Sequence, residues 1–221
     1  MRRNHLLFDL DGTLVVSLPD LAQALNLQLA EQGLKRLELA QVRLMIGDGA
    51  QKLVERAFAA AGQVGLPDIE RAVARFIELY EESPAQRTTV YPGVAETLGE
   101  LRGLGMKLAV VTNKPQNATL QVLEGLGLKD LFDAVVGAGP SLALKPDPAP
   151  LKAALAQMGS TDAQALMVGD NANDVAAAKA LGIPVIAVAY GYARVSPGKL
   201  GADLLIENFD DLPSALCWFP N

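Results

Sequence analysis

The chain has 221 residues, half of them hydrophobic and a fifth charged, as in ordinary globular proteins, and this length suits one core with an insertion or two small domains. Its net charge of −6 argues against nucleic-acid binding, because proteins that bind nucleic acids need clustered basic residues. No apolar run reaches the roughly eighteen residues that a membrane-spanning helix needs. Cys217 is the only cysteine, which excludes a disulfide within the chain and fits a reducing cytoplasm.

The first predicted strand, residues 6–9, ends at two aspartates. Asp9 and Asp11 lie two positions apart, and a Gly12-Thr13 turn follows. Buried carboxylates are costly unless a cation holds them, and Mg²⁺ prefers such oxygen ligands, so this pattern predicts a site. A simple Asp-Gly hairpin turn is the alternative. Because the strand follows the basic start Met1-Arg2-Arg3 directly, a cleaved signal peptide would remove the two aspartates, and we expect none.

Residues 15–82 show helical patterns and no convincing strand, and residues 83–92 follow as a linker. Apolar residues recur there at helical spacing, which predicts helices that pack on one another. The three stripes comprise Leu21, Leu25 and Leu29; Ala50, Leu53, Val54, Ala57, Phe58 and Ala61; and Ile69, Val73, Phe76 and Tyr80.

The remaining chain alternates between strand and helix patterns. Apolar runs predict strands near residues 107–112, 134–136, 165–169, 185–188 and 204–206. The helical patterns between them end at Gly105, Gly127, Gly159 and Gly182, as glycine commonly ends helices. This alternation predicts an α/β fold with a parallel sheet and helices on both of its faces.

Polar residues stand where these predicted strands stop, at the edge where open α/β sheets bind ligands. Thr112 and Asn113 end the second strand, and Lys145 precedes a helix that begins with proline. Asp170 and Asp174 follow the strand at 165–169. We expect the neighbouring Lys114 to be a solvated loop lysine and His5, the only histidine, to be structural.

These segments resemble the four motifs of the haloacid dehalogenase superfamily. Motif I matches Asp9-x-Asp11-Gly12-Thr13, motif II Thr112-Asn113, motif III Lys145-Pro146, and motif IV Gly169-Asp170 with Asp174. The resemblance implies a Rossmann-like catalytic core of residues 1–14 and 87–221. It also implies that residues 15–86 form an inserted all-helical cap that closes over the site.

The resemblance also implies a role for each residue. Asp9 would attack phosphorus to form an aspartyl-phosphate, and Asp11 would act as general acid and base. Mg²⁺ would be held by the Asp9 carboxylate, the Asp11 backbone carbonyl and the Asp170 carboxylate. We expect the carboxyl groups of Asp9, Asp11 and Asp170 to converge on this ion. Asp174 would support the metal or ligate it, although an ordinary acid at a helix N-terminus fits equally well. The phosphoryl group would be bound by Thr112, Asn113 and Lys145.

Within the superfamily the chain is most similar to phosphoglycolate phosphatases, through residues 11–21, 49–57 and 145–151. A small phosphorylated metabolite is therefore the expected partner of a cytoplasmic monomer or homodimer, without nucleic acid or membrane. The alternatives are a phosphatase of sugar or amino-sugar phosphates and a transferase of the β-phosphoglucomutase type. A non-catalytic sensor of phosphorylated ligands is a further alternative, although binding alone does not require the Asp9 and Asp11 pair.

Overall fold

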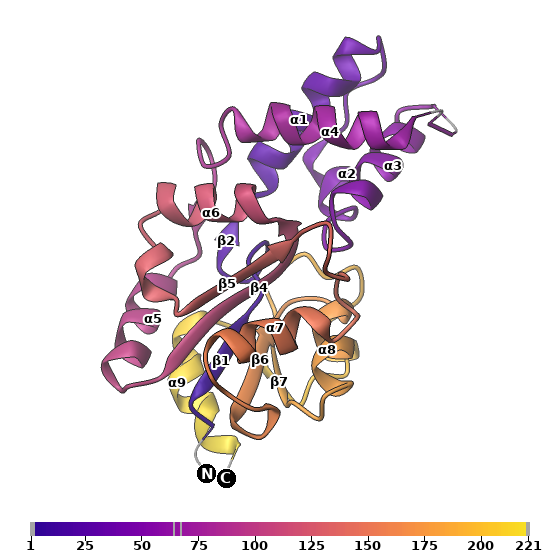
Figure 1. The fold of residues 1–221 in the computed structure, drawn as a ribbon. Coiled ribbons are helices and arrows are strands. Elements are labelled where there is room, and N and C mark those ends of the chain that lie inside the picture. The colour runs from indigo at the N-terminus through magenta and orange to yellow at the C-terminus, as the bar shows by residue number, and fades with distance from the viewer. Residues whose placement is uncertain (1–2, 64, 67, 220–221) are drawn as a thin grey trace.

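The computed structural model describes residues 3–63, 65–66 and 68–219, so Met1 and Arg2 of the basic start lie outside it. In the described part, a parallel sheet of six strands has the order β5-β4-β1-β6-β7-β8 (Figure 1). All six predicted strands are present, and β4 extends three residues further than expected. Their bounds are β1 His5–Phe8, β4 Lys107–Pro115, β5 Ala134–Ala138, β6 Ala165–Gly169, β7 Val185–Val188 and β8 Leu204–Ile206.

The order in which the chain adds strands to the sheet reverses at β1. The chain adds β4 and β5 on one side of β1, and β6, β7 and β8 on the other. Phe8 at the end of β1 lies beside Val110 of β4 and Val168 of β6. Because all three strands run in parallel, the polar residues that follow them emerge at one edge, which is the usual ligand site of such sheets.

Helices cover both faces of the sheet, as predicted. Leu6 and Phe8 of β1 pack on one face with α5, α6 and α9, whereas Leu7 packs on the other face with α7 and α8. This alternation follows from the two-residue period of a strand. Each fully buried large apolar side chain stabilises the fold by about 1.5–3 kcal/mol. The helices are α5 Val94–Gly103, α6 Gln116–Gly125, α7 Ala149–Gln157, α8 Ala172–Lys179 and α9 Leu212–Ala215.

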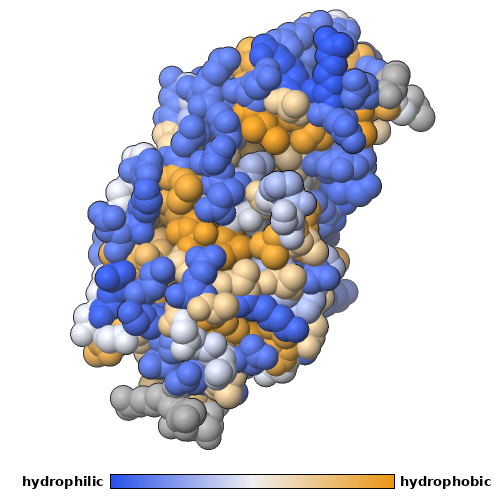
Figure 2. All heavy atoms as spheres, in the orientation of Figure 1, coloured by the Kyte–Doolittle hydropathy of each residue, from blue (hydrophilic) through white to orange (hydrophobic). Residues whose placement is uncertain are grey.

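A separate lobe of helices stands above the carboxyl edge of the sheet (Figure 1). It contains α1 Leu18–Glu31, α2 Leu39–Arg43, α3 Ala50–Ala60 and α4 Ile69–Glu81. The three predicted apolar stripes pack against one another in its core, together with Ala118 of α6. Figure 2 shows a largely hydrophilic outer surface on this lobe, with hydrophobic residues visible between the polar ones.

The connection between lobe and sheet differs from the sequence prediction. β2 (Val15–Val16) pairs with β3 (Thr89–Val90) in an antiparallel ladder, where we expected no strand and a plain linker. Two-residue strands are too short to show a periodic pattern, and they form only because the fold brings them together. The buried Asp20 carboxylate supports this crossing by accepting hydrogen bonds from the backbone N–H groups of Arg87 and Thr88.

Short 3₁₀ helices complete the chain at Lys129–Leu131, Asp162–Gln164, Pro197–Lys199, Phe209–Asp211 and Leu216–Trp218. Among the described residues, no helix combines the length and the apolar character that crossing a membrane requires.

Candidate active site

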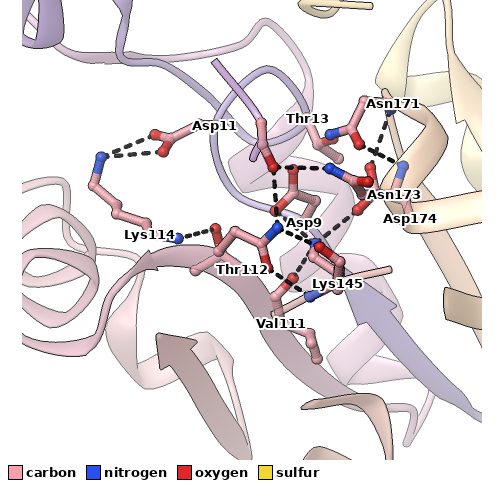
Figure 3. Close-up of polar contacts among 12 residues, drawn as sticks. Asp9, Asp11, Thr13, Val111, Thr112, Lys114, Lys145, Asn171, Asn173 and Asp174 are labelled. Carbon is pink, nitrogen blue, oxygen red and sulfur yellow. Dashed lines mark hydrogen bonds and ion pairs between the residues drawn. The ribbon is translucent and has the colours of Figure 1, made fainter. Parts of the chain in front are cut away.

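Three buried aspartates meet at the carboxyl edge of the sheet, and Figure 3 labels two of them, Asp9 and Asp174. Asp9 follows β1, whereas Asp170 follows β6 and Asp174 lies in the first turn of α8. One carboxylate oxygen from each of them lies within 4.8 Å of the others, and we call these residues the acidic trio. The sheet therefore brings together three of the predicted site residues from opposite ends of the chain.

Lys145 supplies the cation that touches the acidic trio. Its Nζ lies 2.9 Å from Oδ1 of Asp9 and 2.7 Å from Oδ1 of Asp174, and it donates to the Val111 carbonyl oxygen at 2.6 Å. Its side chain is only 2% exposed, so it is not an ordinary surface lysine. The Asn113 side chain fixes the Lys145 backbone, because Oδ1 accepts from its N–H and Nδ2 donates to its carbonyl oxygen, both at 2.8 Å.

The trio carries more negative charge than Lys145 can balance. Burial raises the pKa of Asp9 to about 6, with Lys145 opposing the shift and Asp174 adding to it. Burial and the neighbouring Asp9 and Asp174 also raise the pKa of Asp170 well above its usual value. Burial alone would lower the pKa of Lys145, but Asp174 and Asp9 raise it instead. Such an excess of buried carboxylate oxygens fits a divalent cation with oxygen preference, such as Mg²⁺.

Hydrogen bonds from backbone N–H groups and from the Thr13 hydroxyl fix the orientation of Asp170 and Asp174. Asp170 accepts a hydrogen bond from the Thr13 hydroxyl at 3.1 Å and another from the Tyr192 N–H at 2.6 Å. Oδ2 of Asp174 accepts from the N–H groups of Asp170 and Asn171, both at 3.1 Å, and caps α8. The two interpretations of Asp174 are therefore compatible, because one carboxylate both caps the helix and faces the site.

The carboxyl group of Asp11 does not join the trio, which corrects the expectation that it would converge with those of Asp9 and Asp170. It pairs instead with Lys114, whose Nζ lies 3.1 Å from both Asp11 oxygens (Figure 3). The expectation of a solvated Lys114 is also wrong, since its side chain is 2% exposed. Lys114 is buried because α4 of the helical lobe lies over it and places the Tyr80 ring 4.4 Å from Nζ.

The two motif II residues behave differently from each other. The Thr112 hydroxyl accepts a hydrogen bond from the Lys114 N–H at 3.2 Å and keeps its own proton for another acceptor. The Asn113 amide donates to the carbonyl oxygens of Gly47 and Lys145, so both of its protons are engaged. Asn113 was expected to contact the phosphoryl group, but in this arrangement it positions Lys145 and the loop of the helical lobe.

Comparison with known proteins identifies the family to which this site belongs. Residues 6–188 match the haloacid dehalogenase-like hydrolases. The chain belongs to this family. The resemblance inferred from the four motifs is therefore confirmed, and the protein is a hydrolase.

Curated relatives of the hydrolase align over nearly its whole length. A phosphoglycolate phosphatase of Rhodospirillum rubrum is 47% identical over 217 residues, covering 96% of this chain and 89% of the relative. One of Caulobacter vibrioides is 44% identical, covering 94% and 88%. Among solved structures, a predicted phosphoglycolate phosphatase of Haemophilus somnus is 34% identical with a TM-score of 0.90, covering 97% and 99%.

The hydrolase has a small cavity between the sheet edge and the helical lobe. Asp9, Asp11 and Lys114 line it from the sheet side, and Phe76 and Tyr80 line it from α4. Its volume is about 50 Å³, whereas one water molecule needs about 10–15 Å³. The cavity has room for a small ligand, and a larger neighbouring cavity of about 650 Å³ shares Ala50, Ile77, Asn113 and Pro115 with it.

Sequence reasoning missed the contacts that join the helical lobe of the hydrolase to its sheet. The Asp48 carboxylate accepts hydrogen bonds from Asn173 at 2.6 Å and from Arg194, and it also pairs with Arg56. Gly47-Asp48-Gly49 gave no signal in the sequence, because it lacks the strand and the third glycine of a dinucleotide-binding loop.

Proposed function

We propose that this hydrolase is a Mg²⁺-dependent phosphatase of small phosphomonoesters, with 2-phosphoglycolate as its preferred substrate. The observation that carries the proposal is the Asp9 carboxylate, which lines the cavity while Lys145 holds one of its oxygens at 2.9 Å. A phosphoryl group in that cavity would meet an oriented nucleophile next to a cation. The small cavity and the names of the two curated relatives support the choice of substrate.

The metal would be held by the Asp9 and Asp170 carboxylates and by the Asp11 backbone carbonyl. Asp174 fits an outer, supporting position, because both of its oxygens already accept hydrogen bonds, from Lys145 and from two backbone N–H groups. When bound, Mg²⁺ would neutralise charge on the phosphoryl oxygens.

The reaction proceeds in two steps. In the first, an Asp9 oxygen attacks phosphorus, the bond from phosphorus to the ester oxygen breaks, and Asp11 gives that oxygen a proton. In the second, Asp11 takes a proton from a water molecule, whose oxygen attacks the aspartyl-phosphate and releases phosphate. Thr112 holds a phosphoryl oxygen in both steps through its hydroxyl proton. The Lys145 ammonium group, whose three protons go to Asp9, Asp174 and Val111, stabilises the phosphoryl charge as a neighbouring cation.

We further propose that the chain forms two domains with different roles. Residues 1–14 and 87–221 form the catalytic core, and residues 15–86 form a cap that joins the core beside the paired strands β2 and β3. The cap contributes the apolar wall of the cavity and excludes water from the reacting group. The enzyme would work as a monomer or homodimer. The exposed free thiol of Cys217 agrees with a location in the reducing cytoplasm.

A phosphate-release screen tests this proposal. The purified protein is assayed with and without Mg²⁺ on 2-phosphoglycolate and on sugar, amino-sugar and nucleotide monophosphates. We expect Mg²⁺-dependent release that is fastest from 2-phosphoglycolate. Far better turnover of another monoester would change the substrate, and an isomerised sugar with a bisphosphate intermediate would indicate a mutase.

The variant D9N tests the nucleophile in the same assay. Removing the attacking carboxylate is expected to lower kcat by at least about 10⁴-fold, because the remaining groups only bind and polarise the substrate. The matched control is D130N, which changes an exposed aspartate away from the site. Wild-type activity in D9N would reject the assignment of Asp9.

A further inference from the structure

Lys114 is a cavity cation that the two proposed reaction steps leave unused. It lies near the end of β4, and its ammonium group lines the same cavity as Asp9 and Asp11. Its partners are the Asp11 carboxylate, with both oxygens at 3.1 Å, and the Tyr80 ring. An ammonium ion buried at the wall of a binding cavity has to be explained, because taking it out of water is costly.

The Asp11 carboxylate offsets the free-energy cost of burying the Lys114 ammonium group in this position. Its two oxygens, each 3.1 Å from Nζ, compensate the buried ammonium group for the water that it has lost. In the proposed reaction, however, Asp11 has to turn its carboxyl group toward the leaving oxygen. Lys114 would then lose the partner that Figure 3 shows, and a buried cation without a partner is strongly unfavourable.

We propose that Lys114 binds a carboxylate of the substrate and thereby selects phosphomonoesters that carry a carboxyl group close to the ester oxygen. This inference rests on the proposed function and names the residue that sets its substrate class. The substrate carboxylate replaces Asp11 as the partner of Lys114, in the position where both Asp11 oxygens now lie 3.1 Å from Nζ.

The position of Lys114 matches such a substrate. Asp11 serves the leaving oxygen, and Lys114 lies next to Asp11, so its ammonium group is within reach of atoms just beyond that oxygen. In 2-phosphoglycolate a single methylene group separates the ester oxygen from the carboxyl carbon.

The helical lobe strengthens this interaction. Leu21, Phe76, Ile77 and Tyr80 form an apolar wall beside Lys114. Charges attract more strongly in such surroundings than in water, and the Tyr80 ring face adds a cation–π contact at 4.4 Å. The helical lobe therefore influences substrate selection by making the surroundings of Lys114, a residue of β4, less polar.

The test compares two substrates that differ only in the carboxyl group. The ratio of kcat/KM for 2-phosphoglycolate to kcat/KM for ethyl phosphate is measured for the wild type, K114M and K114R. We expect the wild type to prefer 2-phosphoglycolate at least about tenfold and K114M to lower the ratio by about 10- to 100-fold, as for the loss of one charged hydrogen bond. K114R should retain most of the preference, because a guanidinium group also binds carboxylates.

The ratio separates selection of the substrate from positioning of Asp11. If Lys114 only orients Asp11, K114M slows both substrates equally and the ratio stays constant, which overturns the proposal. A wild type that hydrolyses both compounds equally well also overturns it, without any variant having to fold, while the phosphatase function stands. If neither compound releases phosphate, the proposed function itself is contradicted, and the role of Lys114 is rejected with it.

Discussion

At the scale of single residues, Lys145 has the largest predicted effect on stability. It is the ammonium group that pairs with Asp9 and Asp174, and all three side chains are buried. K145M would leave these carboxylates without that partner, which typically costs about 3–5 kcal/mol of unfolding free energy. Urea denaturation at neutral pH without divalent ions measures this loss.

The matched control is K152M, which changes an exposed lysine of α7. A surface substitution of this kind is expected to stay within about 0.5 kcal/mol of the wild type. If K145M is as stable as K152M, then Lys145 does not balance the trio. Lys145 would in that case be important only for the phosphoryl group.

At the scale of elements, the loop between α2 and α3 holds the helical lobe to the sheet through Asp48. Burial would raise the pKa of Asp48, but hydrogen bonds from Arg194, Asn173 and Arg56 lower it below its usual value. A carboxylate with a lowered pKa stabilises the fold above its unfolded pKa of about 3.9, and this contribution is lost as pH falls through the folded value.

The variant D48N should therefore have a pH-dependent effect. We expect it to lower the unfolding free energy by about 1 kcal/mol at pH 7, because the network is partly open to solvent. The difference from the wild type should shrink as pH falls from about 4 through the lowered folded pKa, below which the carboxylate is protonated in both states. Denaturation series at several pH values measure it, with D130N as control, and a constant difference would contradict the ionic origin.

Sequence patterns predicted the elements that carry the site but not the contacts between distant elements. Apolar runs that end in polar residues located Asp9, Thr112 and Asp170, since strand ends in a parallel sheet share one edge. The partners of Lys114 and Asp48 could not be predicted in this way. Asp11 and Arg194 lie far from them in the chain. The Lys114–Asp11 pair forms when the neighbouring strands β1 and β4 come together, and the Arg194–Asp48 contact forms only when the helical lobe packs on the sheet.

At the scale of the whole molecule, an acidic protein has to accept an anionic substrate. The net charge is −6, and the three carboxylates of the acidic trio face one Lys145. A divalent cation at the trio would remove this conflict only in the folded state, because the three aspartates come together only there. We therefore expect metal binding to raise the stability of the fold.

Thermal unfolding measures this coupling. At a Mg²⁺ concentration of about 100 times its Kd, binding stabilises the folded state by about 2.7 kcal/mol, which raises Tm by roughly 5–10 °C. D170N should lose most of this shift. In EDTA, however, it should be at least as stable as the wild type, because it removes one buried negative charge while an amide oxygen can still accept from the Tyr192 N–H. Equal Mg²⁺ shifts in both proteins would mean that the ion binds elsewhere, and marked instability of D170N in EDTA would mean that Asp170 serves the fold more than the metal.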